Sequence, residues 1–120
     1  FNSHKVYFDE TFENVPRCCS HNAEKIFVGC DKGDIVIIDK STFESTIISL
    51  GDVNFKHIDA LAEGNYFVAG NYDNAVFCFD TEKMEVVGFE QLDERIKDVK
   101  ILKHNAVALG NDGSMVNIEF

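Results

Sequence analysis

The chain has 120 residues, of which 45% are hydrophobic and 27% charged, and its formal net charge is −10. This composition excludes a disordered chain, because eleven Phe residues, with many Ile and Val, supply ample apolar surface. No run reaches the roughly 18 apolar residues that a membrane-spanning helix needs. The negative charge disfavours nucleic acid and anionic membrane surfaces as partners, since both are bound through Lys and Arg.

The four cysteines are spaced without a Cys-x-x-Cys pair, which argues against a zinc ribbon or a thioredoxin-type motif: Cys18, Cys19, Cys30 and Cys78. We expect them to be reduced and to act as small apolar residues, as in an intracellular protein of the cytoplasm or nucleus. No spacing of Cys and His suggests metal ligands. The sequence therefore predicts neither a metal site nor a cofactor.

The predicted elements are all strands. Val, Ile and Phe dominate them, and Asp, Asn and Gly clusters separate them. In chain order, the predicted strands and hairpins cover residues 5–9, 17–20, 26–39, 45–50, 58–62, 67–80, 86–90, 98–103 and 107–120.

Three of these segments, 26–39, 67–80 and 107–120, are hairpins that repeat about every 40 residues. In each of them an apolar run ends at a glycine, and a short turn cluster precedes a second apolar run. The repeat aligns Gly29, Gly70 and Gly110, and it assigns the turn positions to Asp31, Asp73 and Asp112. One strand precedes each hairpin and another follows it, so each period holds four strands.

Four strands in about 40 residues is the spacing of a β-propeller blade. The sequence thus predicts an all-β fold of three tandem blades of four antiparallel strands. An isolated row of three blades exposes two apolar faces, so we expect it to belong to a larger ring of roughly six to eight blades. Two completions remain open: further blades of the same gene product, or a second copy joined head to tail, each copy lending residues 5–9 to the other.

The second repeat resembles the WD40-repeat family. Residues 69–74 read Ala-Gly-Asn-Tyr-Asp-Asn and residues 76–80 read Val-Phe-Cys-Phe-Asp, similar to the family's Ser-Gly-Ser-x-Asp-Gly turn and closing Trp-Asp. Asp39 and Asp80 match the closing Asp, whereas Ile38 and Phe79 stand where Trp is usual, and the family's Gly-His pair is absent. The resemblance implies a rigid scaffold whose loops before the first strand and between the second and third strands share one face.

The leading functional prediction is a non-catalytic scaffold for protein–protein interaction within a multiprotein complex, because rigid scaffolds concentrate binding in their loops. Acidic residues crowd the predicted loop face, so the expected partner is a protein, and a basic one. A plain solubilising role for these acids is the alternative. The candidate partner-binding residues are Glu90, Asp93, Glu94, Asp9, Glu10 and Glu13, with Phe55 and Tyr72 as aromatic anchors.

Two other functions remain as alternatives. One is a self-assembling half-propeller dimer. The other is an enzyme or a small-molecule binder that uses the central channel of the ring. The sequence contains neither a Gly-x-Ser-x-Gly elbow nor a His-Glu-x-x-His motif, so we expect that the protein is not an enzyme.

Overall fold

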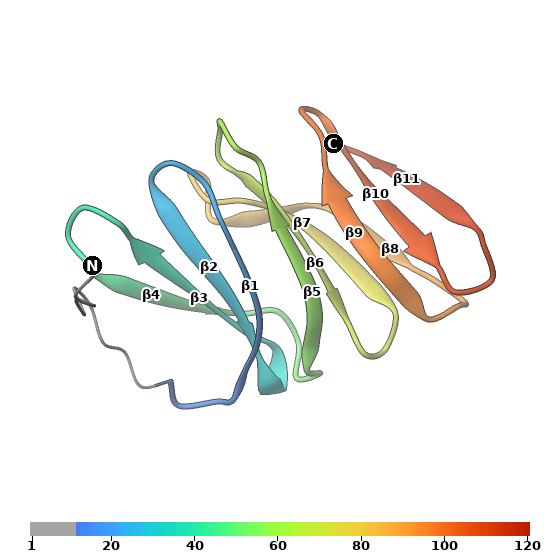
Figure 1. Ribbon diagram of the computed structural model, residues 1–120, viewed down its shortest axis with the longest axis horizontal. Coiled ribbons are helices and arrows are strands. Elements are labelled where there is room, and N and C mark those ends of the chain that lie inside the picture. Colours follow the sequence, from blue (N-terminus) through green and yellow to red (C-terminus); the bar gives the residue numbers. More distant parts are fainter. Residues whose placement is uncertain (1–11) are drawn as a thin grey trace, which may run out of the picture.

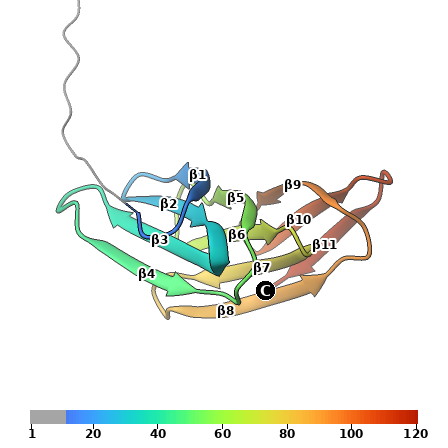
Figure 2. The same ribbon diagram turned by 90° about the horizontal axis from the view of Figure 1, so that it is seen from below.

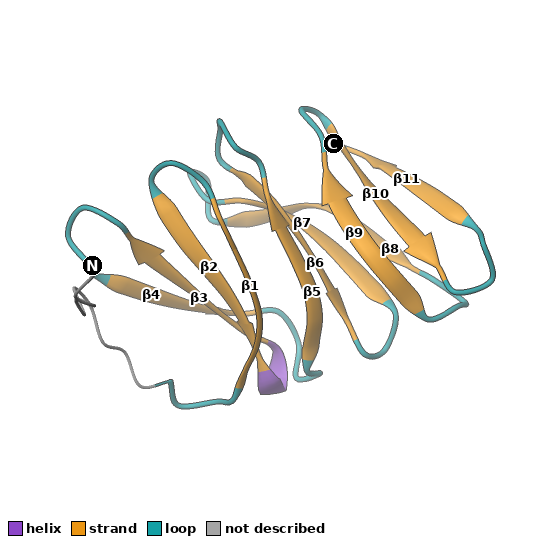
Figure 3. Ribbon diagram, viewed as in Figure 1, coloured by secondary structure: helices purple, strands orange, loops and turns teal. Residues whose placement is uncertain are grey.

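The computed structural model describes residues 12–120. The predicted strand at residues 5–9 lies outside the described residues. The described chain is built of antiparallel strands that form three sheets, packed face to face in a row (Figure 1). Within residues 12–120, the one helical element is η1 (Asp31–Gly33), a single 3-10 turn (Figure 3).

Each sheet corresponds to one predicted blade. The first blade has the strand order β1 (Pro16–His21), β2 (Lys25–Cys30), β3 (Asp34–Asp39), β4 (Ser45–Ser49). The second has the order β5 (Phe55–Ala60), β6 (Tyr66–Asn71), β7 (Ala75–Asp80), β8 (Glu85–Gln91). The third consists of β9 (Ile96–Ile101), β10 (Asn105–Gly110) and β11 (Met115–Glu119), with β10 in the middle.

The predicted hairpins are confirmed to within two residues, and the first strands of the second and third blades differ most in their bounds. Strands β5 and β9 begin at Phe55 and Ile96, earlier than the predicted 58 and 98. The reason is a β-bulge near the start of each strand, where a lysine interrupts the apolar pattern. Sequence periodicity does not anticipate a bulge, because the extra residue shifts the alternation by one position.

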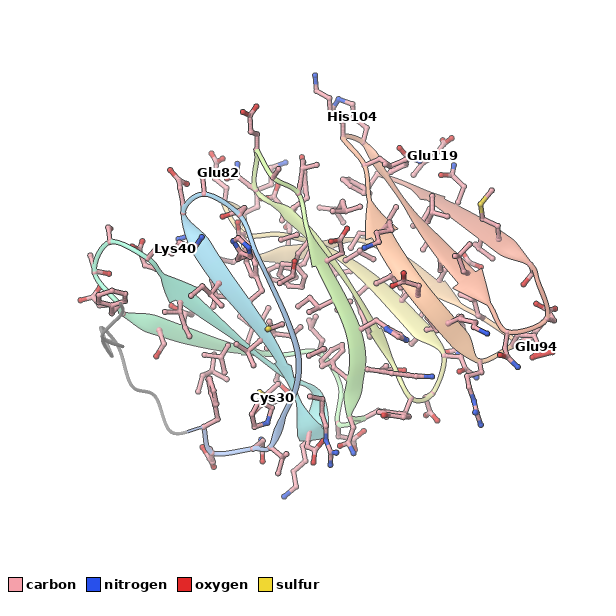
Figure 4. All side chains as sticks on the ribbon, viewed as in Figure 1. Cys30, Lys40, Glu82, Glu94, His104 and Glu119 are labelled. Atoms are coloured by element: carbon pink, nitrogen blue, oxygen red, sulfur yellow. The ribbon has the colours of Figure 1, made fainter. Side chains whose placement is uncertain are left out.

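The three blades stand side by side along their first strands. β1 contacts β5, and β5 contacts β9, whereas β4 and β8 lie at the opposite edge of the row (Figure 2). The turn after the second strand of each blade and the loop between blades meet at one end. There Tyr72 N donates to Asn54 O at 3.0 Å, and Asn111 N donates to Arg95 O at 2.9 Å. We call this end the loop face. Figure 4 shows Glu94 at this end, with Glu82 and His104 at the other.

The cores lie between blades. The interface of the first and second blades is aromatic, and its Phe27 and Phe79 rings lie 5.1 and 5.2 Å from that of Phe67. The interface of the second and third blades is mainly aliphatic, and its buried members include Val68, Val76, Ile96, Val99 and Ile118. Each blade thus buries its surface against its neighbours, and a blade by itself would leave that surface open to water.

The strand register corrects the predicted alignment of the third glycine. Gly29 pairs with Ile35 and Gly70 pairs with Val76, but the equivalent pair in the third blade is Leu109 with Met115. Gly110 therefore lies one position later, and its predicted superposition on Gly29 and Gly70 is wrong. The cause is an unequal first turn: residues 61–66 form a longer loop than residues 22–25 or 102–105, so the repeat has no constant spacing.

The predicted turn residues are also not all equivalent. Asp73 and Asp112 occupy equivalent turn positions, but Asp31 lies one position earlier, at the place of Tyr72. The position that follows Asp73 and Asp112 has positive φ in all three blades: Gly33 at 78°, Asn74 at 64° and Gly113 at 90°. Gly and Asn tolerate this left-handed backbone best, which explains why these residue types stand there.

The side chain that caps the turn also differs between blades. In the second blade, Asn71 Oδ1 accepts from the backbone N of Asp73 at 2.9 Å and of Ala75 at 3.0 Å. In the third blade, Asp112 Oδ1 accepts from Ser114 N at 2.9 Å and Ser114 Oγ at 2.6 Å. Asn71 is thus the cap that the sequence alignment missed, because it lies at the end of a strand and not inside the turn cluster.

Candidate functional site

The structure brings three of the predicted acidic residues together on the loop face. Glu90, Asp93 and Glu94 line a groove of about 330 Å³, and Asp112 completes it from the third blade. We call this surface the acidic groove. Its lining residues are Glu90, Gln91, Leu92, Asp93, Glu94, Asp112, Ser114 and Val116. The volume lies at the lower end of the range of ligand pockets, which is about 300 to 1,000 Å³.

The backbone of the groove is held by its link to the neighbouring turn. Leu92 is only 7% exposed, and its N donates to Asn74 O at 2.9 Å. Gln91 Nε2 donates to Asp73 O at 2.6 Å. Because Leu92 is buried as an anchor, the following Asp93 and Glu94 stay exposed to solvent at the groove. The loop therefore presents its acids from a fixed backbone.

The charged form of one groove residue, Asp112, is favoured by its hydrogen bonds. The hydroxyl and backbone N of Ser114 lower the pKa of Asp112, because both donate hydrogen bonds to its charged form. Four acidic side chains around a groove lined also by buried Leu92 and half-buried Val116 can bind a Lys or Arg side chain, whose aliphatic stem can lie on the apolar residues. Sequence reasoning treated Asp112 only as a turn residue and did not foresee that it joins this groove.

The second predicted acidic rim is not assembled in the described chain. Glu13 is exposed in the segment before β1. Asp9 and Glu10 lie outside the described residues. The acidic groove is therefore the one cluster of predicted partner-binding acids that the structure of residues 12–120 brings together.

The two predicted aromatic anchors have different outcomes. Phe55 is fully buried, with an exposed fraction of 0%, so its predicted place on the binding surface is wrong. It is the first residue of β5 and packs in the interface of the first two blades, a contact that only the neighbouring blade creates. Tyr72 is 57% exposed on the loop face, and the Nζ of Lys56 lies 5.5 Å from the centre of its ring.

Other parts of the described surface offer less chemistry. A shallow hollow of about 250 Å³ lies at the opposite end of the blades, between the turns at residues 22–24 and 62–65. Among residues 12–120, no group of three or more His, Cys, Asp or Glu side chains is placed to hold a metal ion. The same residues contain no helix with the length and apolar character of a membrane span.

All four cysteines are free thiols. Burial raises the pKa of Cys18 to about 11 and that of Cys78 to about 12. At neutral pH both thiols are therefore protonated and weakly nucleophilic, since the thiolate is the reactive species. Cys18 and Cys78 are packing residues.

Comparison with solved structures places this architecture. The chain is similar to the β-propeller domain of Cps50 (Swd1) from Myceliophteria thermophila, with a TM-score of 0.80, 13% identity, and coverage of 91% of this chain and 35% of that one. It is also similar to BamB from Moraxella catarrhalis, with a TM-score of 0.65, 14% identity, and coverage of 85% and 30%. A third similar structure is that of the computationally designed protein Ika8, with a TM-score of 0.72, 11% identity, and coverage of 88% of this chain and 33% of that one.

No family model matches the chain, and no curated protein matches it by sequence. The identities of 11 to 14% show the fold alone. The described chain has the fold of three consecutive β-propeller blades, and it spans about a third of the length of each similar structure.

Proposed function

We propose that the chain is a segment of a WD40-like propeller that acts as a non-catalytic scaffold within a multiprotein complex and binds a basic segment of a protein partner in the acidic groove. The observation that carries this proposal is the convergence of Glu90, Asp93, Glu94 and Asp112 on one groove of the loop face. These acids come from two blades, so a partner can contact all of them only when the two blades are packed together.

The WD40-like assignment is supported by the closing Asp of two blades. Asp80 is 4% exposed, and its carboxylate accepts from the backbone N of Glu82 at 2.8 Å and of Lys83 at 3.1 Å. Asp39 accepts in the same way from Ser41 and Thr42. Both carboxylates order the turn between the third and fourth strands, a structural role that does not require the missing Trp. The free thiols agree with a reducing, cytoplasmic or nuclear compartment.

A larger ring is the second part of the proposal. The third blade leaves Leu109 and Met115 exposed, at 41% and 68%, whereas Val28, Cys30, Val36 and Ile38 of the first blade are already buried, with Phe12 packed against them. Further blades of the same gene product are the favoured complement, and a second copy is the alternative. Native mass spectrometry distinguishes them, since an exchanged dimer has a mass of about 27 kDa, twice the 13.5 kDa of the chain.

The acidic groove is tested by charge reversal. The probe is a fluorescein-labelled octalysine peptide, and its affinity is measured by fluorescence anisotropy. Glu90→Lys/Asp93→Lys/Glu94→Lys is expected to weaken binding by about tenfold or more, because three attractive rim charges become repulsive. The unfolding midpoint should stay within error, since exposed charges contribute little to stability.

The matched control makes the same change of charge at the opposite end of the blades. Glu24→Lys/Glu44→Lys/Glu63→Lys alters three exposed residues of turns that lie away from the acidic groove. This variant is expected to lose only the part of the affinity that depends on net charge. Equal losses in the two triple variants would reject the groove and leave its acids as solubilising residues.

A further inference from the structure

The first strand of every blade carries a β-bulge near its start, at an equivalent place in the register. The residue inside the bulge is a cation in all three blades: Arg17, Lys56 and Lys97. Only 11 of the 120 residues are Lys or Arg, so a cation at three equivalent positions stands out against an acidic background. Bulges re-aim side chains and are frequent beside functional sites.

The neighbouring residues orient two of these cations. Arg17 Nε and Nη2 donate to the Asp31 carboxylate at 2.7 and 3.0 Å, and this pairing raises the pKa of Arg17, with a smaller contribution from Tyr72. Lys56 Nζ donates to Ile96 O at 3.1 Å and lies over the Tyr72 ring. Tyr72 thus lies near the cations of two adjacent blades, with 57% of its surface exposed.

The three cations lie on neighbouring strands. β1 contacts β5 and β5 contacts β9, so the three strands follow one another along one edge of the row (Figure 2). Each carries its bulge near its start, at the end that forms the loop face. Arg17, Lys56 and Lys97 are called the inner cation row. The acidic groove lies farther out, where β8 ends and the turn of the third blade begins. The acidic groove is thus distinct from the inner cation row, in which Arg17 is paired with Asp31 and the two lysines form no ion pair among the described residues.

We propose that the inner cation row, with Tyr72, binds an acidic segment of a protein partner. Lysine ammonium groups donate to carboxylates, and Tyr72 supplies an exposed ring of the kind that anchors interfaces. The hydrogen bond from Lys56 to Ile96 holds its side chain in place, so less side-chain freedom is lost on binding. The inference rests on the proposed function of the loop face in protein recognition, and it adds a second ligand of opposite charge.

The test uses a fluorescein-labelled octaglutamate peptide, with anisotropy as the readout. Lys56→Gln/Lys97→Gln is expected to weaken its binding about tenfold, because two favourable charge contacts are removed. The control Lys83→Gln/Lys103→Gln makes the same charge change in exposed turns at the other end of the blades, and it should retain nearly the full affinity. Equal affinity of the two double variants for octaglutamate would overturn the proposal.

A variant of an exposed residue serves as the control for loss of binding through misfolding. Lys97 is exposed, so Lys97→Glu should keep the unfolding midpoint and still weaken octaglutamate binding more than Lys103→Glu does. A single-stranded oligonucleotide tests a polyanion of another class. If it binds the wild-type chain more tightly than octaglutamate does, an acidic protein segment is rejected as the ligand.

These measurements test the acidic groove and the inner cation row independently. The reversal of Glu90, Asp93 and Glu94 should reduce octalysine binding and leave octaglutamate binding equal or stronger, because repulsive charges are removed. The Lys56→Gln/Lys97→Gln variant should show the opposite pattern. If only the acidic-groove variant loses its ligand, octalysine, the result supports the acidic groove and rejects the inner cation row. If only the lysine variant loses its ligand, octaglutamate, the result supports the inner cation row and rejects the acidic groove.

Discussion

The two interfaces between blades use the same geometry with different residues. In the first, Gly29 leaves room for Phe55 of the next blade, and a Cβ at this glycine would lie 3.0 Å from the Phe55 Cβ. In the second, Gly70 leaves room for Ile96, and a Cβ there would lie 3.1 Å from the Ile96 Cδ1. An aromatic and an aliphatic core are thus compatible with the same packing of blades. In both, a glycine leaves space for the first side chain of the next blade.

A polar contact repeats in the same way. Ser20 Oγ accepts from Ala60 N at 3.0 Å, and Asp59 Oδ2 accepts from Ile101 N at 2.9 Å. Ser20 and Asp59 occupy equivalent positions, so each blade satisfies a backbone donor of the next one. The third blade has Lys100 and Leu109 at the positions of the acceptor and the glycine. A blade packed on its outer face cannot form these same two contacts.

The largest expected effect comes from removing the residue that fills the space beside each glycine. Phe55→Ala should destabilise the chain by about 3 to 5 kcal/mol, and Ile96→Ala by about 2 to 4, because the aromatic side chain leaves the larger cavity. Urea unfolding measures both. If Ile96→Ala cost more than Phe55→Ala, the aromatic interface would not be the stronger of the two.

Filling the glycine positions should cost less and should differ between the interfaces. Gly29→Ala is expected to destabilise by about 2 to 3 kcal/mol and Gly70→Ala by about 1. The new Cβ at Gly29 would lie 2.7 Å from Cys18 Sγ and close to the Cβ of Phe55, whereas at Gly70 it meets the mobile end of Ile96. Cys18→Ala in the Gly29→Ala background should recover part of the loss, and full additivity would contradict this explanation.

The repeated hydrogen bond predicts a smaller pair of effects. Asp59→Ala should cost about 1.5 to 3 kcal/mol, since a charged acceptor is lost, and Ser20→Ala about 0.5 to 1.5. Both values come from urea unfolding at neutral pH. Asp59→Ser, which restores the residue type of the first blade, is the matched control and should recover part of the stability. Equal costs for both alanine variants would show that the charge of Asp59 contributes nothing.

The smallest expected difference is in pH dependence. Cys18 and His57 occupy equivalent positions, and burial, followed by the charge of Lys56, lowers the pKa of His57 despite the nearby Asp98. Below about pH 6.5 the unfolded chain then binds more protons at this residue than the folded chain, so stability falls as the pH falls. Cys18 stays protonated through this range because its pKa is about 11.

Unfolding at pH 7.5 and pH 5.5 tests this difference. His57→Gln should lose less stability between the two pH values than the wild-type chain, and Cys18→Ala should lose as much as the wild type. His57 Nε2 is buried and has no hydrogen-bond partner, so the substitution removes no hydrogen bond at that atom. An identical pH response of the wild-type and His57→Gln chains would exclude His57 as the cause.

Local chemistry predicted most of the strands. Apolar runs flanked by Asp, Asn and Gly located the hairpins within a residue or two, because turn formation and alternation depend on a few adjacent residues. The alignment failed at Gly110, since the longer turn at residues 61–66 made the repeat irregular. Residues of the acidic groove were identified in part: Glu90, Asp93 and Glu94 by their density, but Asp112 only by the packing of the third blade.

The sequence by itself determined the strand content, the turn positions and the division into three blades, because backbone preferences and side-chain alternation act over short distances. The tertiary structure alone decided that Phe55 is buried, although it was expected on the loop face together with Tyr72, which is exposed as predicted. It also decided that three bulges align Arg17, Lys56 and Lys97 along one border. These properties depend on the neighbouring blade, whose contacts are made by residues about 40 positions away in the chain.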